Sequence, residues 1–543
     1  MSSEDASSKL LADLDQDQAA AASALHGPVA IIAAAGSGKT RTVSHRIAHG
    51  IQTGAYAANR VFALSYTNRA AAELRSRLRS LGARDVAVRT FHSAALAQLQ
   101  FFWPQLTDSF APKLVTNKAP LIHEVLEQMS IQPTAQMKAG LQAEVELIRY
   151  SMQSVEAHTA QPDRKLPLGP EQFVEFFQGF EALKQKRKII DWEDALLLCV
   201  GLLRDQPRML AHVQQQYRFF TVDEYQDISV LQQSLLETWL GDRQELCVVG
   251  DPRQTIYTFA GARSDFLTDF SSRYESAQVF ELNRNYRSSQ EIVALANRVS
   301  PDAPIAAVRK VSSKPSFQSY KTASLEATEV VSSISTLLSN GSQKAQIAVL
   351  SRTNSQLAPV ETALRQAGID YQVRGAGRFF KRPEVVQGMG AIRALQASDA
   401  TEPLFIEVSK IITSLGWTSV GEKNEKWAAL NWFIDVLEET ETESLDEYLR
   451  ELDERERSGH EPLRDAVMLA TVHGTKGLEF ENVFLIGMNQ GFFPIGYAKT
   501  AQEQAEERRL FYVAITRAKD TLAISHRLDK PVSEYITQYD NHS

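Results

Sequence analysis

The chain has 543 residues, of which 43% are hydrophobic and 23% charged, and its formal net charge is −8. This composition is typical of water-soluble globular proteins of roughly three or four domains, and the two cysteines, Cys199 and Cys247, are too few for a disulfide framework or a four-cysteine zinc site. No apolar run approaches the roughly 18 residues of a membrane span, and the polar start MSSEDASSK lacks a signal-peptide core, so we expect a cytoplasmic protein without membrane contact.

Short apolar runs typical of buried strands recur along the chain, each followed by a helix-like pattern. They lie at residues 29–33, 61–66, 219–223, 246–251, 347–351, 467–472, 483–487 and 521–525. Strands that alternate with helices predict an α/β fold with parallel sheets, and the early and late groups predict two such domains. The stretches at about 105–188 and 396–462 have helical periodicity without convincing strands, so we expect helical insertions there.

The first strand-like run leads into AAAGSGKT, residues 33–40. Gly36 and Gly38 allow backbone N–H groups to close around phosphate oxygens, Lys39 can reach the β- and γ-phosphates, and Thr40 offers a hydroxyl to Mg²⁺. The usual loop pattern has glycine where this chain has Ala33, and a glycine turn before an ordinary helix is the alternative interpretation. A second site is therefore needed to decide.

Charge is unevenly distributed along the chain. Residues 60–89 hold seven arginines and two acidic residues, a net charge of +5, whereas residues 435–456 hold eleven acidic residues and two arginines, a net charge of −9. A solvated helix surface is the simpler explanation of either cluster. The distribution nevertheless leaves polyanion binding open despite the negative total.

The run FFTVDEYQD, residues 219–227, supplies the second site. Its strand ends in Asp223 and Glu224, and the carboxyl end of a strand is where an α/β sheet binds ligands. Asp223 would bind Mg²⁺, and Glu224 would orient and deprotonate the attacking water. An isolated Asp-Glu pair is usually a turn or a helix start, but together with the Lys-Thr loop it favours nucleoside triphosphate hydrolysis.

Two arginines are candidates for contacting the γ-phosphate. Arg517 follows an apolar helical stripe in EERRLFYVAITRAKD and falls on the same face, where a guanidinium must find an anion. A structural ion pair with a carboxylate is the alternative. In LNRNYRSSQEI, Arg287 precedes a predicted helix, with Ser288 and Glu291 spaced as a capping box, and Tyr286 offers a flat face for a base.

Together these motifs resemble those of superfamily 1 DNA helicases of the UvrD/PcrA/Rep type, in the family's order and over most of the chain. The matching segments are LDQDQAAAAS, AAAGSGKTR, FALSYTNRAAAELRSRL, TFHSAALAQL, VDEYQD, VVGDPRQTIYTFAGA, NYRSSQEI, YQVRGAGRFFKRPEV, TVHGTKGLEFENVFLIG and EERRLFYVAITRAK. The resemblance implies two tandem RecA-like P-loop domains, each with a mainly helical insertion, and ATP in the cleft between them.

The resemblance also implies roles for the residues of an ATP site. The catalytic set is Lys39, Asp223, Glu224, Gln254, Arg287 and Arg517, and the metal ligands are Thr40 and Asp223. The ATP-binding set is Gln18, Gly36, Ser37, Gly38, Lys39, Thr40, Arg41, Tyr286, Arg287, Glu479 and Arg517. In it Gln18 reads adenine, Tyr286 stacks on the base, Glu479 holds the ribose and Gln254 senses the γ-phosphate.

The implied nucleic-acid partners are single-stranded and tailed duplex DNA. The implied DNA-binding residues are Tyr66, Asn68, Arg69, Thr90, His92, Tyr257, Phe259 and His473. Bases would stack on Tyr66, Tyr257 and Phe259, which is tolerant of sequence, and the arginine-rich stretch after Tyr66 would follow the phosphates. We also expect DNA-repair proteins as partners, and a monomer or weak dimer.

The family pattern predicts the domain boundaries. Domain 1A comprises residues 1–104 and 189–281, with insertion 1B at 105–188; domain 2A comprises 282–395 and 463–530, with a reduced acidic insertion 2B at 396–462, and 531–543 form a C-terminal tail. Three residues and one insertion depart from the family pattern. Ala34 and Phe259 replace a common glycine and a common tryptophan, Ala260 replaces a frequent arginine, and the short acidic insertion makes duplex binding by 2B doubtful. We expect Ala34 to keep a negative φ.

The sequence therefore predicts an ATP- and Mg²⁺-dependent helicase that moves on single-stranded DNA, 3′-to-5′ by resemblance, in repair or replication-associated processing. One alternative is a translocase that strips proteins from DNA and unwinds weakly. A second, from another class, is an ATP-switched DNA clamp, against which Glu224 and Arg517 weigh. A P-loop kinase would leave the aromatic residues and the second α/β domain unexplained.

Overall fold

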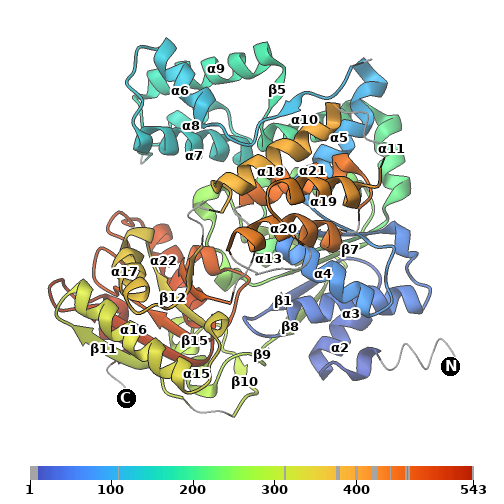
Figure 1. Cartoon of the computed structure of the whole chain (residues 1–543). Helices are drawn as coiled ribbons and strands as arrows, with labels where there is room; N and C mark the ends of the chain where they lie inside the picture. The colour runs from blue at the N-terminus through green and yellow to red at the C-terminus, as the bar shows by residue number, and fades with distance from the viewer. Residues whose placement is uncertain are drawn as a thin grey trace.

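Two six-stranded parallel sheets form the framework of the protein (Figure 1). The computed structural model describes residues 10–107, 109–162, 164–310, 313–374, 379–397, 402–418, 425–440, 442–458, 462 and 465–540. The predicted α/β class with two RecA-like sheets is confirmed, and all eight apolar runs are strands of these sheets.

The first sheet has the strand order β3-β2-β6-β7-β1-β8. Its strands are β1 (Val29–Ala33), β2 (Val61–Ser65), β3 (Ala87–Thr90), β6 (Phe219–Val222), β7 (Leu246–Gly250) and β8 (Gln278–Leu282). Because successive side chains alternate between the two faces, each face has its own apolar core. One face packs against α5 (Phe91–Thr107), α10 (Trp192–Asp205) and α12 (Val230–Leu240), and the other against α3 (Lys39–Gln52) and α4 (Asn68–Ser80).

The second sheet has the strand order β11-β16-β15-β12-β14-β13. Its strands are β11 (Ser316–Tyr320), β12 (Ile347–Ser351), β13 (Tyr371–Val373), β14 (Val467–Thr471), β15 (Phe480–Leu485) and β16 (Ala518–Arg527). Helices α15 (Gln290–Val299), α22 (Ala501–Ile515) and α23 (Glu534–Asp540) share the core of one face, and α16 (Ala323–Ser339) and α17 (Ala358–Gln366) that of the other.

Two helical groups interrupt the sheets. The first contains α6 (Ala119–Gln128), α7 (Ala135–Ser151), α8 (Val155–Thr159) and α9 (Pro170–Arg187), next to a two-residue strand pair of β4 (Lys113–Leu114) and β5 (Ile189–Ile190). The second contains α18 (Pro383–Ala394), α19 (Leu404–Ser414), α20 (Glu425–Thr440) and α21 (Leu445–Ser458), which share one apolar core. In Figure 1 this second group lies over α4 and α5. The exact domain boundaries remain a prediction.

The remaining elements are short or peripheral. They are α2 (Gln16–Ser23), α11 (Pro207–Gln216), α13 (Asp265–Thr268), α14 (Phe270–Arg273), and the strand pair of β9 (Arg284–Asn285) and β10 (Ala306–Ala307). Within the described residues, no helix is both long and apolar enough to cross a membrane. Both cysteines are buried and free of disulfides, as is common for cysteines that serve as small apolar residues.

Candidate active site and nucleic-acid interface

The loop between β1 and α3 has the form that phosphate binding requires. Gly36 and Gly38 both have positive φ, of 70° and 82°, a conformation that glycine adopts without strain. A Cβ on Gly36 would lie 2.7 Å from Nδ2 of Asn285 and 2.8 Å from Cβ of Arg287. The loop therefore needs glycine at position 36 both for its backbone and for the side chains behind it.

Ala34 explains how the loop tolerates alanine at a position where glycine is common. Its φ is negative, as expected, and its methyl group packs in a small buried cluster with Val293 of α15 and Ile305. The Ala34 N–H donates to the carbonyl of Leu282 at 3.0 Å. The methyl group thus adds apolar contact without imposing an unfavourable backbone.

Gln18 lies behind the loop and does not line the cleft. Its side-chain Nε2 donates to the carbonyl of Ser37 at 2.8 Å, and its Oε1 accepts from the N–H of Asp15 in a capping box at the start of α2. The side chain is buried. In this arrangement Gln18 supports the phosphate loop, while its predicted contact with adenine stays a prediction.

Asp223 and Glu224 follow β6 directly, and Asp223 is buried whereas Glu224 is half-buried. Glu224 has a φ of 52°, in the left-handed region that non-glycine residues rarely adopt, and such strain concentrates at functional sites. Burial and the neighbouring Glu224 raise the pKa of Asp223. Burial opposes ionisation of Glu224 too, but Lys39 and Lys476 outweigh it and lower the pKa of Glu224. Glu224 is therefore the stronger candidate for a carboxylate that stays ionised.

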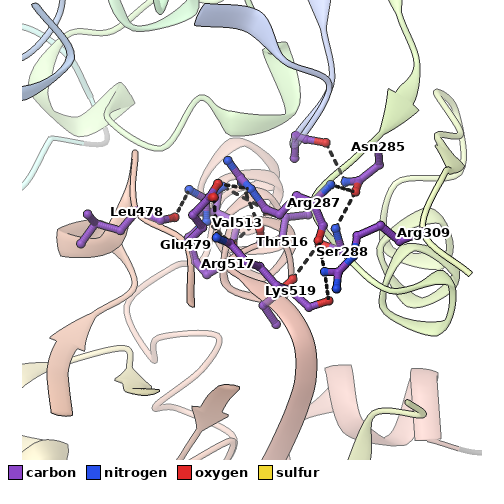
Figure 2. Close-up of polar contacts among 12 residues, drawn as sticks. Asn285, Arg287, Ser288, Arg309, Leu478, Glu479, Val513, Thr516, Arg517 and Lys519 are labelled. Atoms are coloured by element: carbon purple, nitrogen blue, oxygen red, sulfur yellow. Dashed lines mark hydrogen bonds and ion pairs between the residues drawn. The ribbon is translucent and has the colours of Figure 1, made fainter. Parts of the chain in front are cut away.

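Arg517 is buried without a carboxylate partner among the described residues. Only 1% of its surface is exposed, and its guanidinium donates to the carbonyls of Val513 and Leu478 (Figure 2). It also donates to Oε1 of Gln254. It lies just after the end of α22 rather than on the helix. Burial and the neighbouring Arg287 lower the pKa of Arg517 to about 9. An anion bound between Arg517 and Arg287 would offset both the burial of the Arg517 charge and the repulsion between the two guanidinium groups.

Arg287 faces the same space from the segment before α15 (Figure 2). Its Nε lies 2.6 Å from Oε2 of Glu479, and Glu479 also pairs with Lys519 at 2.8 Å. Glu479, predicted to hold the ribose, is thus paired with Arg287, predicted to contact the γ-phosphate. Tyr286 is 39% exposed, and its hydroxyl donates to Asp15.

The expected capping box of Ser288 and Glu291 is wrong. Helix α15 begins at Gln290, and Oδ1 of Asn285 accepts the N–H groups of Arg287 and Ser288 at 2.9 and 2.7 Å. The Ser288 hydroxyl donates instead to the carbonyl of Ala518 at 2.7 Å. Asn285 also donates to the carbonyl of Ala35, so it joins the phosphate loop to the arginine.

A cleft of about 650 Å³ brings the predicted ATP-site residues together. Those that line it are Gly36, Ser37, Gly38, Lys39, Thr40, Arg41, Asp223, Glu224, Gln254, Tyr286, Arg287, Glu479 and Arg517, so that Gln18 alone of the predicted set is absent. The loop, Asp223, Glu224 and Gln254 follow strands of the first sheet, whereas Glu479 and Arg517 flank strands of the second. The cleft therefore combines cationic and acidic groups from both sheets.

The oxygen ligands in this cleft suit Mg²⁺. Within the described residues, no cluster of three or more His, Cys, Asp or Glu side chains could hold a metal by itself. Mg²⁺ in nucleotide sites usually has only one or two protein ligands and takes the rest from phosphates and water. The carboxylate of Asp223 and the hydroxyl of Thr40, both lining the cleft, match that pattern.

A cluster of aromatic rings lies next to the cleft. The rings of Tyr66 and Tyr257 stack with centroids 5.6 Å apart and an interplanar angle of 19°. Phe259 packs edge-on against Tyr257 at 6.2 Å and against His473 at 5.8 Å, and 60% of its surface is exposed. Burial, Arg352 and Lys476 lower the pKa of His473 to about 3, so its ring is neutral at physiological pH.

The other predicted DNA-binding residues lie apart from this cluster, and all of them except Arg69 are buried. His92 is buried, with its Nε2 3.1 Å from the hydroxyl of Tyr150. Asn68 and Thr90 are buried beneath Glu454 of α21. Arg69 lines the ATP cleft. The structure thus joins Tyr66, Tyr257, Phe259 and His473 but places the others elsewhere.

Comparisons with known proteins assign the family. Residues 14–275 match the family model of the UvrD/REP helicase N-terminal domain, and residues 280–455 and 396–528 match that of the UvrD-like helicase C-terminal domain. The chain belongs to the UvrD/REP helicase family. It is 37% identical to the ATP-dependent DNA helicase UvrD2 of Mycobacterium tuberculosis over 97% of the chain and 80% of that protein. It is also 26% identical to the ATP-dependent DNA helicase PcrA of Bacillus subtilis, over 96% of the chain and 83% of PcrA.

Lys476 of this helicase is a functional candidate that the sequence argument did not single out. Its Nζ donates to the carboxylate of Asp227 and, at 2.6 Å, to the carbonyl of Gln254, and it lies 5.2 Å from the ring centroid of Tyr257. Lys476 therefore contacts groups of both the cleft and the aromatic cluster. It lies within the motif TVHGTKGLEF, but its partners are more than 200 positions away in the sequence.

Proposed function

We propose that the protein uses ATP to move along single-stranded DNA in the 3′-to-5′ direction and unwinds duplex DNA in repair or replication-associated processing. As a member of the UvrD/REP family, it is an ATP-dependent DNA helicase of the UvrD/PcrA type. One observation supports the motor function most directly. Gln254 lines the ATP cleft, and Tyr257, three positions later, belongs to the aromatic cluster, so one short segment of backbone joins the two sites.

The groups around the cleft suit hydrolysis of a nucleoside triphosphate. Glu224, whose pKa is lowered by Lys39 and Lys476 against the effect of burial, would accept a proton from the attacking water. Lys39, Arg287 and Arg517 would stabilise the charge that develops on the phosphoryl oxygens. Thr40 and Asp223 would hold Mg²⁺, which when bound neutralises phosphate charge. Because the cations come from elements around both sheets, closure of the cleft would complete the site.

The aromatic cluster suits a strand of any sequence. Stacking on an aromatic ring contributes roughly 1 to 3 kcal/mol per base and is tolerant of base identity. Phe259 offers an exposed face, and the stacked pair of Tyr66 and Tyr257 lies behind it. Changes at Gln254 or Lys476 during the ATP cycle would reach Tyr257 through direct contacts.

A translocase that displaces proteins and unwinds weakly is the second candidate. The short group α18–α21 packs against α4 and α5, where it covers predicted DNA-binding residues. The faces of α20 and α21 that pack against α4 and α5 are occupied within the molecule, so they would not be available to grip a duplex ahead of the motor. This position is the observation that favours the second candidate.

Strand displacement on duplexes with a 3′ or a 5′ single-stranded tail tests both candidates. We expect ATP-dependent displacement of the 3′-tailed duplex and none of the 5′-tailed one. If neither duplex were unwound but the protein released streptavidin from biotinylated single strands in the presence of ATP, the protein-displacing translocase would be the better description. If single-stranded DNA did not stimulate ATP hydrolysis at all, the motor function would be refuted and an ATP-switched clamp favoured.

A further inference from the structure

Helix α21 presents one acidic face to the first-sheet domain. Tyr448, Leu449 and Leu452 are buried in the core that α21 shares with α18, α19 and α20. Glu447 and Glu454, seven positions apart and therefore on one side of the helix, point instead toward α4 and the end of β3. Figure 1 shows the group α18–α21 lying over α4 and α5.

These two carboxylates contact residues that were predicted to bind DNA or that lie next to them. Oε1 of Glu447 accepts from Nη2 of Arg89 at 3.0 Å. The hydroxyl of Thr90 donates to Glu454, and the side-chain amide of Asn68, in the orientation that satisfies its hydrogen bonds, donates to both Glu454 oxygens at 3.1 and 3.2 Å. Only 1% of Glu454 is exposed. Guanidinium, hydroxyl and amide donors are the groups with which proteins bind backbone phosphates, so a carboxylate here occupies a phosphate's place.

Charge complementarity extends beyond the individual contacts. Residues 435–456, which span the end of α20 and most of α21, have a net charge of −9, whereas residues 60–89 opposite have a net charge of +5. Between them lies a cavity of about 190 Å³ lined by charges of both signs, among them Arg75, Arg89, Glu447 and Glu451. Burial raises the pKa of Glu447, but Arg89 and Thr442 outweigh it and lower the pKa below its usual value.

The interface has the character of a separable contact. The apolar core of α18–α21 is formed by residues 379–452 alone and includes no residue of the first sheet or its helices. What holds α21 to α4 and α5 is therefore mainly polar and ionic, as in interfaces that open and close. Moving the group away would expose charged groups rather than an apolar core.

We propose that α21 is an intramolecular competitor of single-stranded DNA, in which Glu447 and Glu454 occupy phosphate positions on the surface formed by Asn68, Arg89 and Thr90. A strand that follows this surface must displace the helix. In this arrangement the helicase holds part of its own track closed, so DNA binding and release of α21 are coupled. This inference rests on the proposed function, because it takes this surface as the DNA track.

Two neutralised variants test the inference by fluorescence anisotropy with labelled oligothymidylate in low salt. The test variant is Glu447→Gln/Glu454→Gln, and the matched control is Asp453→Asn/Glu456→Gln, which removes the same charge from the same helix but faces Arg393, 2.6 and 2.9 Å away. We expect Kd to fall about tenfold in the test variant, a typical coupling between two competing ligands, and less than twofold in the control. If Kd changed equally in both variants, the effect would come from the loss of negative charge in general, and the inference would be overturned.

Hydrogen exchange in the wild-type chain provides a second measurement that does not depend on how a variant folds. On addition of oligothymidylate, amides of residues 445–458 should exchange faster, because the helix loses its partners. Unchanged or slower exchange with bound oligothymidylate would overturn the inference. If wild-type protein bound no oligothymidylate, the proposed function itself would fail; if it bound normally and α21 did not respond, only the competitor role would.

Discussion

Arg517 donates a hydrogen bond from Nη2 to Oε1 of Gln254 at 3.2 Å, and both side chains are buried. Gln254 follows β7 of the first sheet, whereas Arg517 precedes β16 of the second. Gln254 in turn donates to Asp251 at 2.8 Å. The two halves of the cleft are thus linked by a hydrogen bond from a charged guanidinium to an uncharged amide oxygen, at the point where a γ-phosphate is proposed to sit. A phosphate could take the place of Gln254 as the acceptor.

Replacing Arg517 with alanine should lower ATP turnover by about 10³-fold or more, the effect attributed to arginine fingers, with a smaller change in KM. The reason is that the guanidinium acts on charge that develops during hydrolysis rather than on the bound nucleotide. Steady-state ATPase assays with saturating oligothymidylate measure both constants. A variant that raised KM and kept kcat would show that Arg517 only binds ATP.

Glu224→Gln should retain ATP and DNA binding but lose turnover, because glutamine keeps the shape and cannot accept the proton. Lys39→Ala should lose ATPase activity altogether. Glu73→Gln is the matched control, since Glu73 lines the same cleft and pairs with Arg77 at 2.7 Å. Normal turnover in Glu224→Gln, or an equal loss in Glu73→Gln, would disprove the assignment of the base.

Tyr257→Ala should weaken binding of oligothymidylate by roughly 1 to 3 kcal/mol, the contribution of stacking on one ring. Tyr257→Phe, which loses only the hydroxyl that donates to the His473 carbonyl at 3.2 Å, should bind almost normally. The salt dependence of Kd should be unchanged in both, because no phosphate contact is lost. A shallower salt dependence in Tyr257→Ala would indicate that the ring acts through neighbouring cations instead.

Gly36→Ala should abolish most ATPase activity, because the added Cβ would meet Asn285 at 2.7 Å in a backbone conformation with φ of 70°. Ala34→Gly is the contrasting change. It should keep ATP affinity and cost about 1 kcal/mol of stability through the lost buried methyl group. Nucleotide binding and thermal melting separate the two effects, and an active Gly36→Ala enzyme would show that the loop rearranges.

Asp227 gives the stability of the protein a pH dependence. Burial raises its pKa to about 6 despite the ion pair with Lys476, so the folded state holds this proton more tightly than the unfolded state, where the ordinary value is 3.8. Its contribution is complete below pH 3.8 and is lost as the pH rises through 6. Relative to Asp227→Asn, wild-type protein should gain about 1 kcal/mol between pH 7 and pH 5 in urea unfolding. If the free energies of unfolding of the wild type and of Asp227→Asn changed equally with pH, the assignment to Asp227 would be refuted.

The central strands could be predicted from apolar runs, but the edge strands could not. The four strands without such a run, β3, β8, β11 and β13, are the outer strands of the two sheets. Both β8 and β11 are largely exposed, so their residues need not be apolar. The first-sheet side of the cleft could be predicted because the phosphate loop, Asp223 and Gln254 each follow a strand at the carboxyl edge of one sheet. Glu479 and Arg517 precede strands of the second sheet, and only the family resemblance pointed to the cleft between the sheets.

The sequence holds no local pattern that predicts which polar or charged side chains contact each other across long separations. Glu454 and Thr90 are 364 positions apart, and each sequence segment alone suggests only a solvated helix or a DNA contact. Lys476 and Asp227 are 249 positions apart. Pairing of this kind depends on how the helical group and the two sheets are placed, which no short pattern encodes.

The contacts of the phosphate loop have a mechanical consequence. The chain crosses from the first sheet to the second between Leu282 and Gln290, and along this crossing Leu282, Asn285 and Tyr286 each bond to loop residues 34–36. Ala34 packs on α15 at the far side of the crossing. The segment that connects the two sheets, residues 282–290, is therefore bonded directly to the nucleotide-binding loop. A rotation of the second sheet would shift the loop itself, and no separate element is needed to carry motion between them.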